Sequence, residues 1–205
     1  MDLLKLLQEK EISASLRQSL LTQRIISIHT PKELQSDEIQ KIQGEVENLI
    51  FQDKVAPIIF PIRNGGGHLD SGARFARYIS SLENTIGICG PKVGSLGAIL
   101  FLSCKVKIVS EDSSLFFHPN CKSIRIYPDS TYESLEKEFR EIHTELVAHE
   151  PNLYELFEEV SHGQISVNDA RSICRKRSAF HGQEIIAYGL ADHMVETYEV
   201  GINPE

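Results

Sequence analysis

The sequence predicts a single α/β domain, because predicted strands and helices alternate along the chain and several apolar runs are nearly continuous. The runs at 55–62 and 85–89 have the unbroken apolar character of strands covered on both faces, as in a parallel sheet. The 205 residues suffice for one substantial core, and no internal repeat or linker divides them. The expected domain therefore spans 1–205, with 1–12 as an N-terminal segment.

In the N-terminal half, helices are expected where apolar residues recur every three or four positions, and strands where short apolar runs end at turn residues. Leucine-rich segments at 3–10 and 13–22 have helical spacing, and Ile39, Ile42 and Val46 mark one face of a helix at 38–50. The other elements expected here are strands at 25–28, 55–62 and 85–89, and helices at 71–80 and 96–103.

The C-terminal half is expected to contain two strands, a long charged helix, and a mainly helical region closed by a last strand. The two strands are 105–109 and 115–117, and the apolar face of the helix at 131–150 carries Leu135, Phe139, Ile142 and Leu146. Pro151 is expected to end that helix, because proline disfavours helical backbone in the residue before it. Further helices are expected at 153–160, 167–177 and 183–188, with the last strand at 191–195.

Composition excludes several classes of function. The formal net charge of −8 disfavours nucleic-acid binding, and no apolar run reaches the roughly 18–20 residues of a membrane span. The first residues lack the apolar core and cleavage site of a secretion signal, so a cytoplasmic protein is expected. The four cysteines show no metal-ligand or redox spacing and the histidines no HExxH pattern, so no metal and no cofactor are expected.

The stretch 90–98, Gly-Pro-Lys-Val-Gly-Ser-Leu-Gly-Ala, is the strongest chemical signal in the chain. It places Ser95 between a predicted buried strand and a predicted apolar helix. A strand–turn–helix of this kind holds a hydroxyl at the tip of a tight turn and aims the following backbone N–H groups at the same point. That geometry suits an acyl-transfer nucleophile, and His118, at the end of an apolar segment, is a candidate base.

These segments, in their order and spacing, resemble the proteolytic subunit of the Clp protease over roughly residues 13–195. Four segments match motifs of that family: the glycine turn at 65–67, the nucleophile segment at 90–98, Phe-Phe-His-Pro at 116–119 and Tyr-Gly-Leu-Ala-Asp at 188–192. The resemblance implies the ClpP/crotonase-like α/β fold, a repeated β-β-α superhelix with a protruding handle helix. The handle region would be 121–150.

The resemblance also implies a serine endopeptidase. Ser95 would attack the scissile carbonyl, His118 would act as the base, and the backbone N–H groups of Gly66 and Leu96 would form the oxyanion hole. The subunits would assemble into homo-oligomeric rings, stacked through the handle helix. The substrates would be polypeptides, and a Clp-type ATPase would be a partner.

The chain departs from the family at the third member of the catalytic triad. Alignment puts Ser172 or Ile173 where the family has an aspartate, and Asp169, about one helical turn earlier, is the candidate to orient His118. The main alternative is therefore a catalytically degenerate Clp-like subunit that builds or regulates a ring. The N-terminal segment also differs from the family's, which puts docking of a Clp ATPase in question.

Two other interpretations share parts of this one. A Ser–Lys dyad would use Lys92 or Lys122 in place of His118. A crotonase-type acyl-CoA enzyme would share the fold and the paired N–H groups. It would also need a carboxylate opposite the thioester, and none lies near Ser95 in the sequence.

Overall fold

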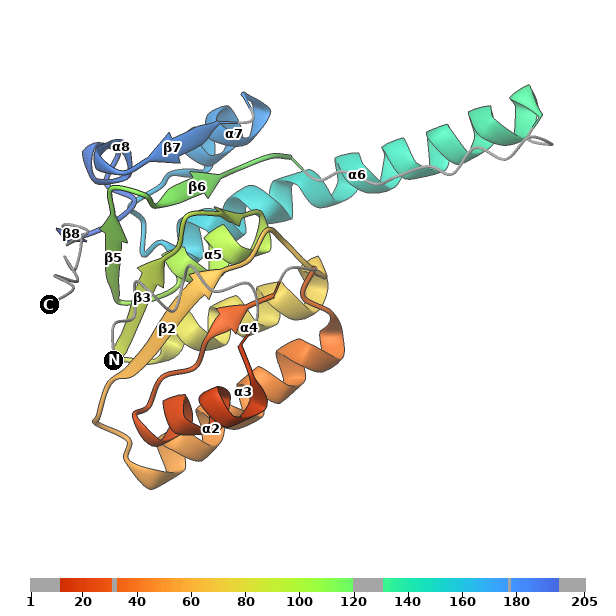
Figure 1. The fold of residues 1–205 in the computed structure, drawn as a ribbon. Helices are drawn as coiled ribbons and strands as arrows, with labels where there is room; N and C mark the ends of the chain where they lie inside the picture. The colour runs from red at the N-terminus through yellow and green to blue at the C-terminus, as the bar shows by residue number, and fades with distance from the viewer. Residues whose placement is uncertain (1–11, 31–32, 120–130, 177, 196–205) are drawn as a thin grey trace, which may run out of the picture.

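A computed structural model describes residues 12–30, 33–119, 131–176 and 178–195, whose arrangement is drawn in Figure 1. The helices are α2 (Ala14–Thr22), α3 (Ser36–Gln52), α4 (Leu69–Ser81), α5 (Leu96–Leu102), α6 (Tyr132–Val160), α7 (Val167–Arg175) and α8 (Gln183–Ala187). The strands are β1 (Ile28–His29), β2 (Ile58–Arg63), β3 (Thr85–Cys89), β4 (Val93–Gly94), β5 (Val106–Ser110), β6 (Ser114–Phe116), β7 (Ala179–His181) and β8 (His193–Val195). Their alternation agrees with the predicted α/β class.

Two sheets organise the molecule. The larger has five strands in the order β1-β2-β3-β5-β8, and all its neighbours pair in parallel. The smaller has the order β4-β6-β7, with β4 parallel and β7 antiparallel to β6. Helices α3, α4 and α5 lie side by side, and α5 contacts β2 and β3 (Figure 1). Parallel neighbours need crossover connections, which explains why helices separate most of the strands along the chain.

The predicted helices at 13–22, 38–50, 71–80 and 96–103 are confirmed within two residues at either end. The predicted apolar face of α3 is buried, through Ile39, Ile42, Val46 and Leu49. The expected strand at 25–28 is shorter than predicted, because Ile25 makes only an isolated bridge to Ile59 and the ladder of β1 begins at Ile28. The segment 3–10 lies outside the described residues.

The start of β2 was predicted three residues too early. The carboxylate of Asp53 accepts the backbone N–H groups of Val55 and Ala56 at 2.8 and 3.0 Å, which closes a turn. These bonds, that from Ala56 first, lower the pKa of the Asp53 carboxyl below its ordinary value. Pro57 follows and has no N–H for a ladder, so β2 begins at Ile58 and Val55 remains exposed.

Helix α6 runs unbroken from Tyr132 to Val160, so the predicted stop at Pro151 is wrong. A proline inside a helix costs about 3 kcal/mol. The helical turns after Pro151 bury four large side chains, those of Leu153, Tyr154, Leu156 and Phe157. Each buried side chain contributes about 1.5–3 kcal/mol, so together they outweigh the cost of the proline. The N-terminal part of α6 projects away from both sheets (Figure 1). Of the predicted handle region, 121–130 lie outside the described residues.

The Tyr-Gly-Leu-Ala-Asp segment ends α8 and ties it to the larger sheet. Gly189 has φ +69°, and the amides of Gly189 and Leu190 close the helix on the carbonyls of Ile186 and Ile185, as in a glycine-terminated helix. Asp192 then accepts the backbone N–H of Lys107 at 2.7 Å, and its carboxylate lies 3.4 Å from the Lys107 ammonium. Lys107 is 2% exposed, so this ion pair neutralises a buried charge.

Candidate active site

The turn after β2 is organised by Asn64, which is buried. Its side-chain oxygen Oδ1 accepts the backbone N–H of Gly66 at 3.0 Å, and its backbone carbonyl accepts the N–H of Gly94 at 2.9 Å. Gly66 has φ +153°, in a region that residues with a side chain rarely adopt. Its carbonyl accepts the N–H of Leu34 at 3.0 Å. The turn is therefore held on both sides, by β4 and by the segment before α3.

Ser95 lies between β4 and α5 with φ +50° and ψ −122°. Such a conformation is strained for a residue with a Cβ and costs about 1–3 kcal/mol, so it persists only where its surroundings enforce it. Two of these constraints are visible: the Ser95 amide donates to the carbonyl of Phe116 at 3.0 Å, and the following residue, Leu96, is buried in the first turn of α5. The predicted turn between the strand at 85–89 and the helix at 96–103 is therefore present, and it contains the short strand β4, which was not predicted.

The glycine turn and the serine turn touch. A Cβ placed on Gly66 would lie 3.3 Å from the Cβ of Ser95 and 3.6 Å from its Oγ, so Gly66 borders the hydroxyl directly. A Cβ on Gly97 would lie 2.3 Å from the carbonyl oxygen of Asn64. The start of α5 can therefore approach the glycine turn only because residue 97 has no side chain. Gly66, Ser95 and Leu96 form one cluster.

His118 follows β6, which runs parallel to β4 beside the serine turn. Gly94 pairs with Phe116, and the Phe116 carbonyl binds the Ser95 amide, so His118 follows the strand that adjoins the serine turn. The imidazole is half-buried, lies 5.7 Å from the Phe116 ring between centroids, and its Nδ1 is 2.7 Å from the carbonyl oxygen of Pro119. A carbonyl oxygen only accepts, so Nδ1 is the donor in this bond.

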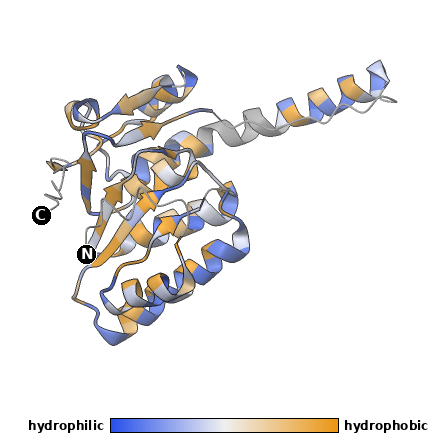
Figure 2. Ribbon diagram, viewed as in Figure 1, coloured by the Kyte–Doolittle hydropathy of each residue, from blue (hydrophilic) through white to orange (hydrophobic). Residues whose placement is uncertain are grey.

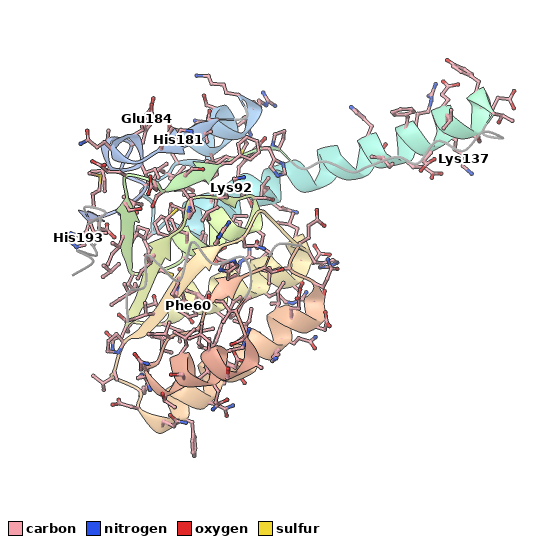
Figure 3. All side chains as sticks on the ribbon, in the orientation of Figure 1. Phe60, Lys92, Lys137, His181, Glu184 and His193 are labelled. Carbon is pink, nitrogen blue, oxygen red and sulfur yellow. The ribbon has the colours of Figure 1, made fainter. Side chains whose placement is uncertain are left out.

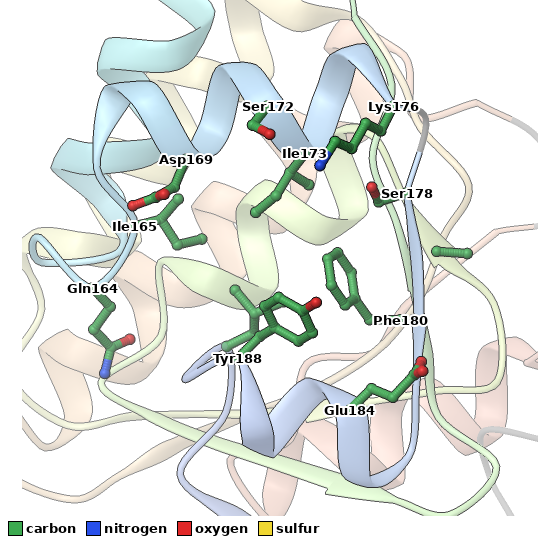
Figure 4. A pocket seen from close by; sticks show the side chains of 12 residues that line it. Gln164, Ile165, Asp169, Ser172, Ile173, Lys176, Ser178, Phe180, Glu184 and Tyr188 are labelled. Carbon is green, nitrogen blue, oxygen red and sulfur yellow. The ribbon is translucent and has the colours of Figure 1, made fainter.

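Asp169 lies in the first turn of α7, where its Oδ2 accepts the hydroxyl of Ser166 at 2.6 Å. The same hydroxyl accepts the Asp169 amide at 3.2 Å, so the two residues cap the helix. Asp169, Ser172 and Ile173 border a cavity of about 400 Å³ between α7, β7 and α8, drawn in Figure 4. Neither Ser95 nor His118 is among the residues that line this cavity.

Other candidate groups are placed less favourably. The side chain of Lys92 is exposed at the turn before β4 (Figure 3), and Lys122 lies outside the described residues. Burial raises the pKa of the Cys89 thiol, and it raises that of Cys104 to about 12, so both thiols stay protonated near neutral pH. Over the described ranges, no group of three or more His, Cys, Asp or Glu side chains could hold a metal ion.

The sequence-based candidates did not include two residues that bind members of the candidate site, Asn64 and Pro119. Asn64 was signalled by its position before three glycines, since asparagine side chains commonly bind the backbone N–H two residues later in turns. The Pro119 carbonyl carried no signal, because a backbone acceptor is not encoded by residue type. The involvement of that carbonyl depends on the torsion angles of His118 and Pro119.

A strained serine at a strand-to-helix turn, bordered by a glycine whose backbone approaches it, is an arrangement used by acyl-transfer enzymes. The family model described as Clp protease matches residues 8–198. The chain therefore belongs to the Clp protease family, has the ClpP/crotonase-like fold predicted for it, and its family supports a peptidase function. Members of this family typically form oligomeric rings. A comparison with curated proteins finds no match. Within the part of the chain that the structure describes, no helix is both long and apolar enough to cross a membrane.

Proposed function

We propose that the chain is a serine peptidase of Clp type in which Ser95 is the nucleophile and His118 the general base. The observation that carries this proposal is the strained backbone of Ser95, at φ +50°, in direct contact with Gly66. Strain of this kind costs stability and clusters at functional sites. A serine that served only as a small packing residue would gain nothing from this conformation.

In the proposed reaction, Ser95 Oγ attacks the carbonyl carbon of the scissile peptide bond while His118 Nε2 takes the hydroxyl proton. The tetrahedral intermediate carries its negative charge on the former carbonyl oxygen. When the C–N bond breaks, His118 returns the proton to the leaving amine, and an acyl ester remains on Ser95. Water, deprotonated by the same imidazole, then hydrolyses the ester and restores the serine.

The backbone N–H groups of Gly66 and Leu96 would stabilise the oxyanion. The Gly66 N–H donates to Asn64 Oδ1, so a substrate oxygen must replace that amide oxygen as its acceptor. A charged oxygen accepts a hydrogen bond about twice as strongly as a neutral one. The exchange therefore favours the oxyanion over the ground-state carbonyl, which is the difference that lowers a reaction barrier.

The projecting part of α6 is the proposed contact between stacked rings. Tyr132 and Phe139 are 79% and 56% exposed, and Leu135 and Ile142 lie on the same face as Phe139 at helical spacing. Figure 2 shows hydrophobic and hydrophilic residues alternating along this part, and Figure 3 places Lys137 on it. An apolar face on a helix that leaves the body needs a partner, and a second copy of the same helix would supply one. Such rings would enclose Ser95 and admit polypeptide substrates, which a Clp-type ATPase would deliver.

The test compares the wild-type protein with Ser95→Ala on a panel of fluorogenic peptides, with assembly measured by light scattering on the same samples. We expect turnover in the wild type and its loss in Ser95→Ala at unchanged particle mass. Covalent labelling of the wild type by a fluorophosphonate, absent in Ser95→Ala, would identify the nucleophile independently of the peptide chosen. Wild-type turnover in the Ser95→Ala variant would contradict the proposal.

A catalytically degenerate, ring-building subunit is the second candidate. Two observations favour it: positions 172 and 173 hold serine and isoleucine rather than a carboxylate, and the Asp169 carboxylate accepts a hydrogen bond from Ser166. Correctly assembled particles with neither turnover nor fluorophosphonate labelling would support this candidate. An acyl-CoA enzyme would instead bind acyl-CoA in a calorimetric titration.

A further inference from the structure

We infer that the backbone carbonyl of Pro119, rather than a carboxylate, orients His118 and fixes the tautomer in which Nδ1 carries the proton and Nε2 is the basic nitrogen. The inference rests on the proposed role of His118 as a general base. It assigns the function of the third triad member to an atom of the main chain.

The hydrogen bond between His118 and Pro119 fixes the tautomer through its length and its acceptor. The distance of 2.7 Å between His118 Nδ1 and the Pro119 oxygen lies at the short end of the range for N–H···O hydrogen bonds. The oxygen of a peptide group has no proton to give, so the bond exists only when Nδ1 is protonated. A neutral imidazole carries one ring proton, so Nε2 is then the unprotonated, basic nitrogen.

The backbone around the Pro119 acceptor has limited freedom. A residue before proline is largely confined to extended backbone, which limits the backbone freedom of His118 itself. The proline ring fixes the φ angle of Pro119. The backbone N–H of Phe117, the residue before His118, donates to the carbonyl of Ser178 at 3.0 Å. This bond ties the segment to the chain just before β7. The segment that carries the acceptor is therefore constrained on the side of β6.

The carboxylate expected to orient His118, that of Asp169, binds a different residue. Asp169 Oδ2 is 2.6 Å from the hydroxyl of Ser166, and that hydroxyl binds the Asp169 amide. The carboxylate thus has a defined role at the start of α7 and borders the cavity of Figure 4. Ser172 and Ile173, at the aligned triad positions, border the same cavity. The local bond to Pro119 makes a carboxylate unnecessary for setting the tautomer.

The carbonyl does not replace every effect of a carboxylate. Both acceptors orient the ring and select the tautomer, but only a carboxylate adds a full negative charge beside the imidazolium formed during the reaction. The structure therefore predicts a peptidase that is slower than a complete triad but faster than one whose imidazole has the wrong tautomer.

The decisive experiment is a ¹⁵N NMR spectrum of histidine-labelled protein at about pH 9, where histidine is neutral. The signal of His118 is identified by its absence in His118→Gln. We expect the Nδ1–H tautomer for His118. The Nε2–H tautomer would overturn the inference, since Nδ1 would then have no proton for Pro119. This result does not depend on peptidase activity, so failure of the proposed function would leave the test intact.

A second experiment separates Pro119 from Asp169 in the active protein. Asp169→Asn removes the charge and keeps both the backbone N–H and a side-chain oxygen that can accept from Ser166, whereas Ser166→Ala removes the capping hydroxyl and keeps the carboxylate, so it controls for a loosened start of α7. We expect the two variants to have equal turnover, within about threefold of wild type. A fall of about 10⁴ in Asp169→Asn alone, as expected when a triad carboxylate is lost, would assign the orienting role to Asp169 and refute the inference.

Discussion

Gly97→Ala should displace the turn at Ser95 without changing any of the residues proposed to act in catalysis. A Cβ at residue 97 would stand 2.3 Å from the carbonyl oxygen of Asn64, whereas real Cβ contacts essentially never fall below 3.0 Å and nine in ten exceed 3.4 Å. The start of α5 must therefore move away from the glycine turn by the difference, about 0.7–1.1 Å. Because Asn64 contributes backbone here, no side-chain rotation can relieve the contact.

The expected loss of activity follows from that displacement. A misplacement of about 1 Å in a catalytic group typically costs about 10²-fold in rate, so we expect turnover of a fluorogenic peptide to fall by about that factor. The free energy of unfolding should change less, because two contributions oppose each other. Overpacking destabilises the fold by about 1–3 kcal/mol, whereas alanine in place of glycine stabilises a helix by about 1 kcal/mol. Turnover and thermal unfolding are measured on the same preparation, with particle mass checked by light scattering.

Gly44→Ala is the matched control for this variant. Gly44 also lies in a helix, α3, but nothing approaches within 4 Å of the position its Cβ would take. The same chemical change there should raise stability by about 1 kcal/mol and leave turnover unchanged. Wild-type turnover and stability in Gly97→Ala would refute the argument that close backbone approach positions Ser95.

Three further outcomes are expected. Ser95→Gly should unfold at a higher temperature than Ser95→Ala, because glycine relieves the strain at φ +50°; equal melting temperatures would contradict that strain. Burial lowers the pKa of His162 below its ordinary value, so the unfolded chain binds more protons than the folded one at acidic pH. The free energy of unfolding should therefore fall as the pH drops from about 7 to about 5. Denaturant titrations over this pH range should show a smaller fall for His162→Asn than for the wild type. Phe139→Lys should halve the particle mass in light scattering by separating stacked rings, whereas Glu138→Gln on the same helix should leave it unchanged.

Much of the fold was predictable because burial leaves a periodic pattern in the sequence. The runs that became β2 and β3 are apolar on both faces, and Ile39, Ile42 and Val46 repeat at helical spacing on the buried side of α3. Strands β4 and β7 left no such pattern, because two or three residues are too short to show a period. The predicted end of the helix at Pro151 was wrong, because the packing of the turns after the proline lets α6 continue.

The candidate site likewise has features that the sequence predicts and one that it does not. The tight turns at Ser95 and Gly66 were predictable, because unusual backbone angles and close approach favour small residues and glycine, while the catalytic roles of the two residues stay predictions. The role of Asp169 stays a prediction that the sequence made by proximity along the chain. The acceptor on His118 is a main-chain oxygen, and any residue type at position 119 would supply one, so only coordinates could identify it.

The ion pair between Lys107 and Asp192 bears on how the protein is made. Lys107 is synthesised 85 residues before the carboxylate that neutralises it, and edge strand β8 follows Asp192 immediately. A buried ammonium without its partner costs about 3–5 kcal/mol, a large part of the 5–15 kcal/mol that holds a domain folded. We therefore expect a nascent chain to stay short of its native state until residue 192 has left the ribosome. A chain that ends at residue 191 should be sensitive to protease, whereas a chain that includes β8 should resist it. During synthesis, quality-control proteases would have a long interval in which to act on unfinished subunits.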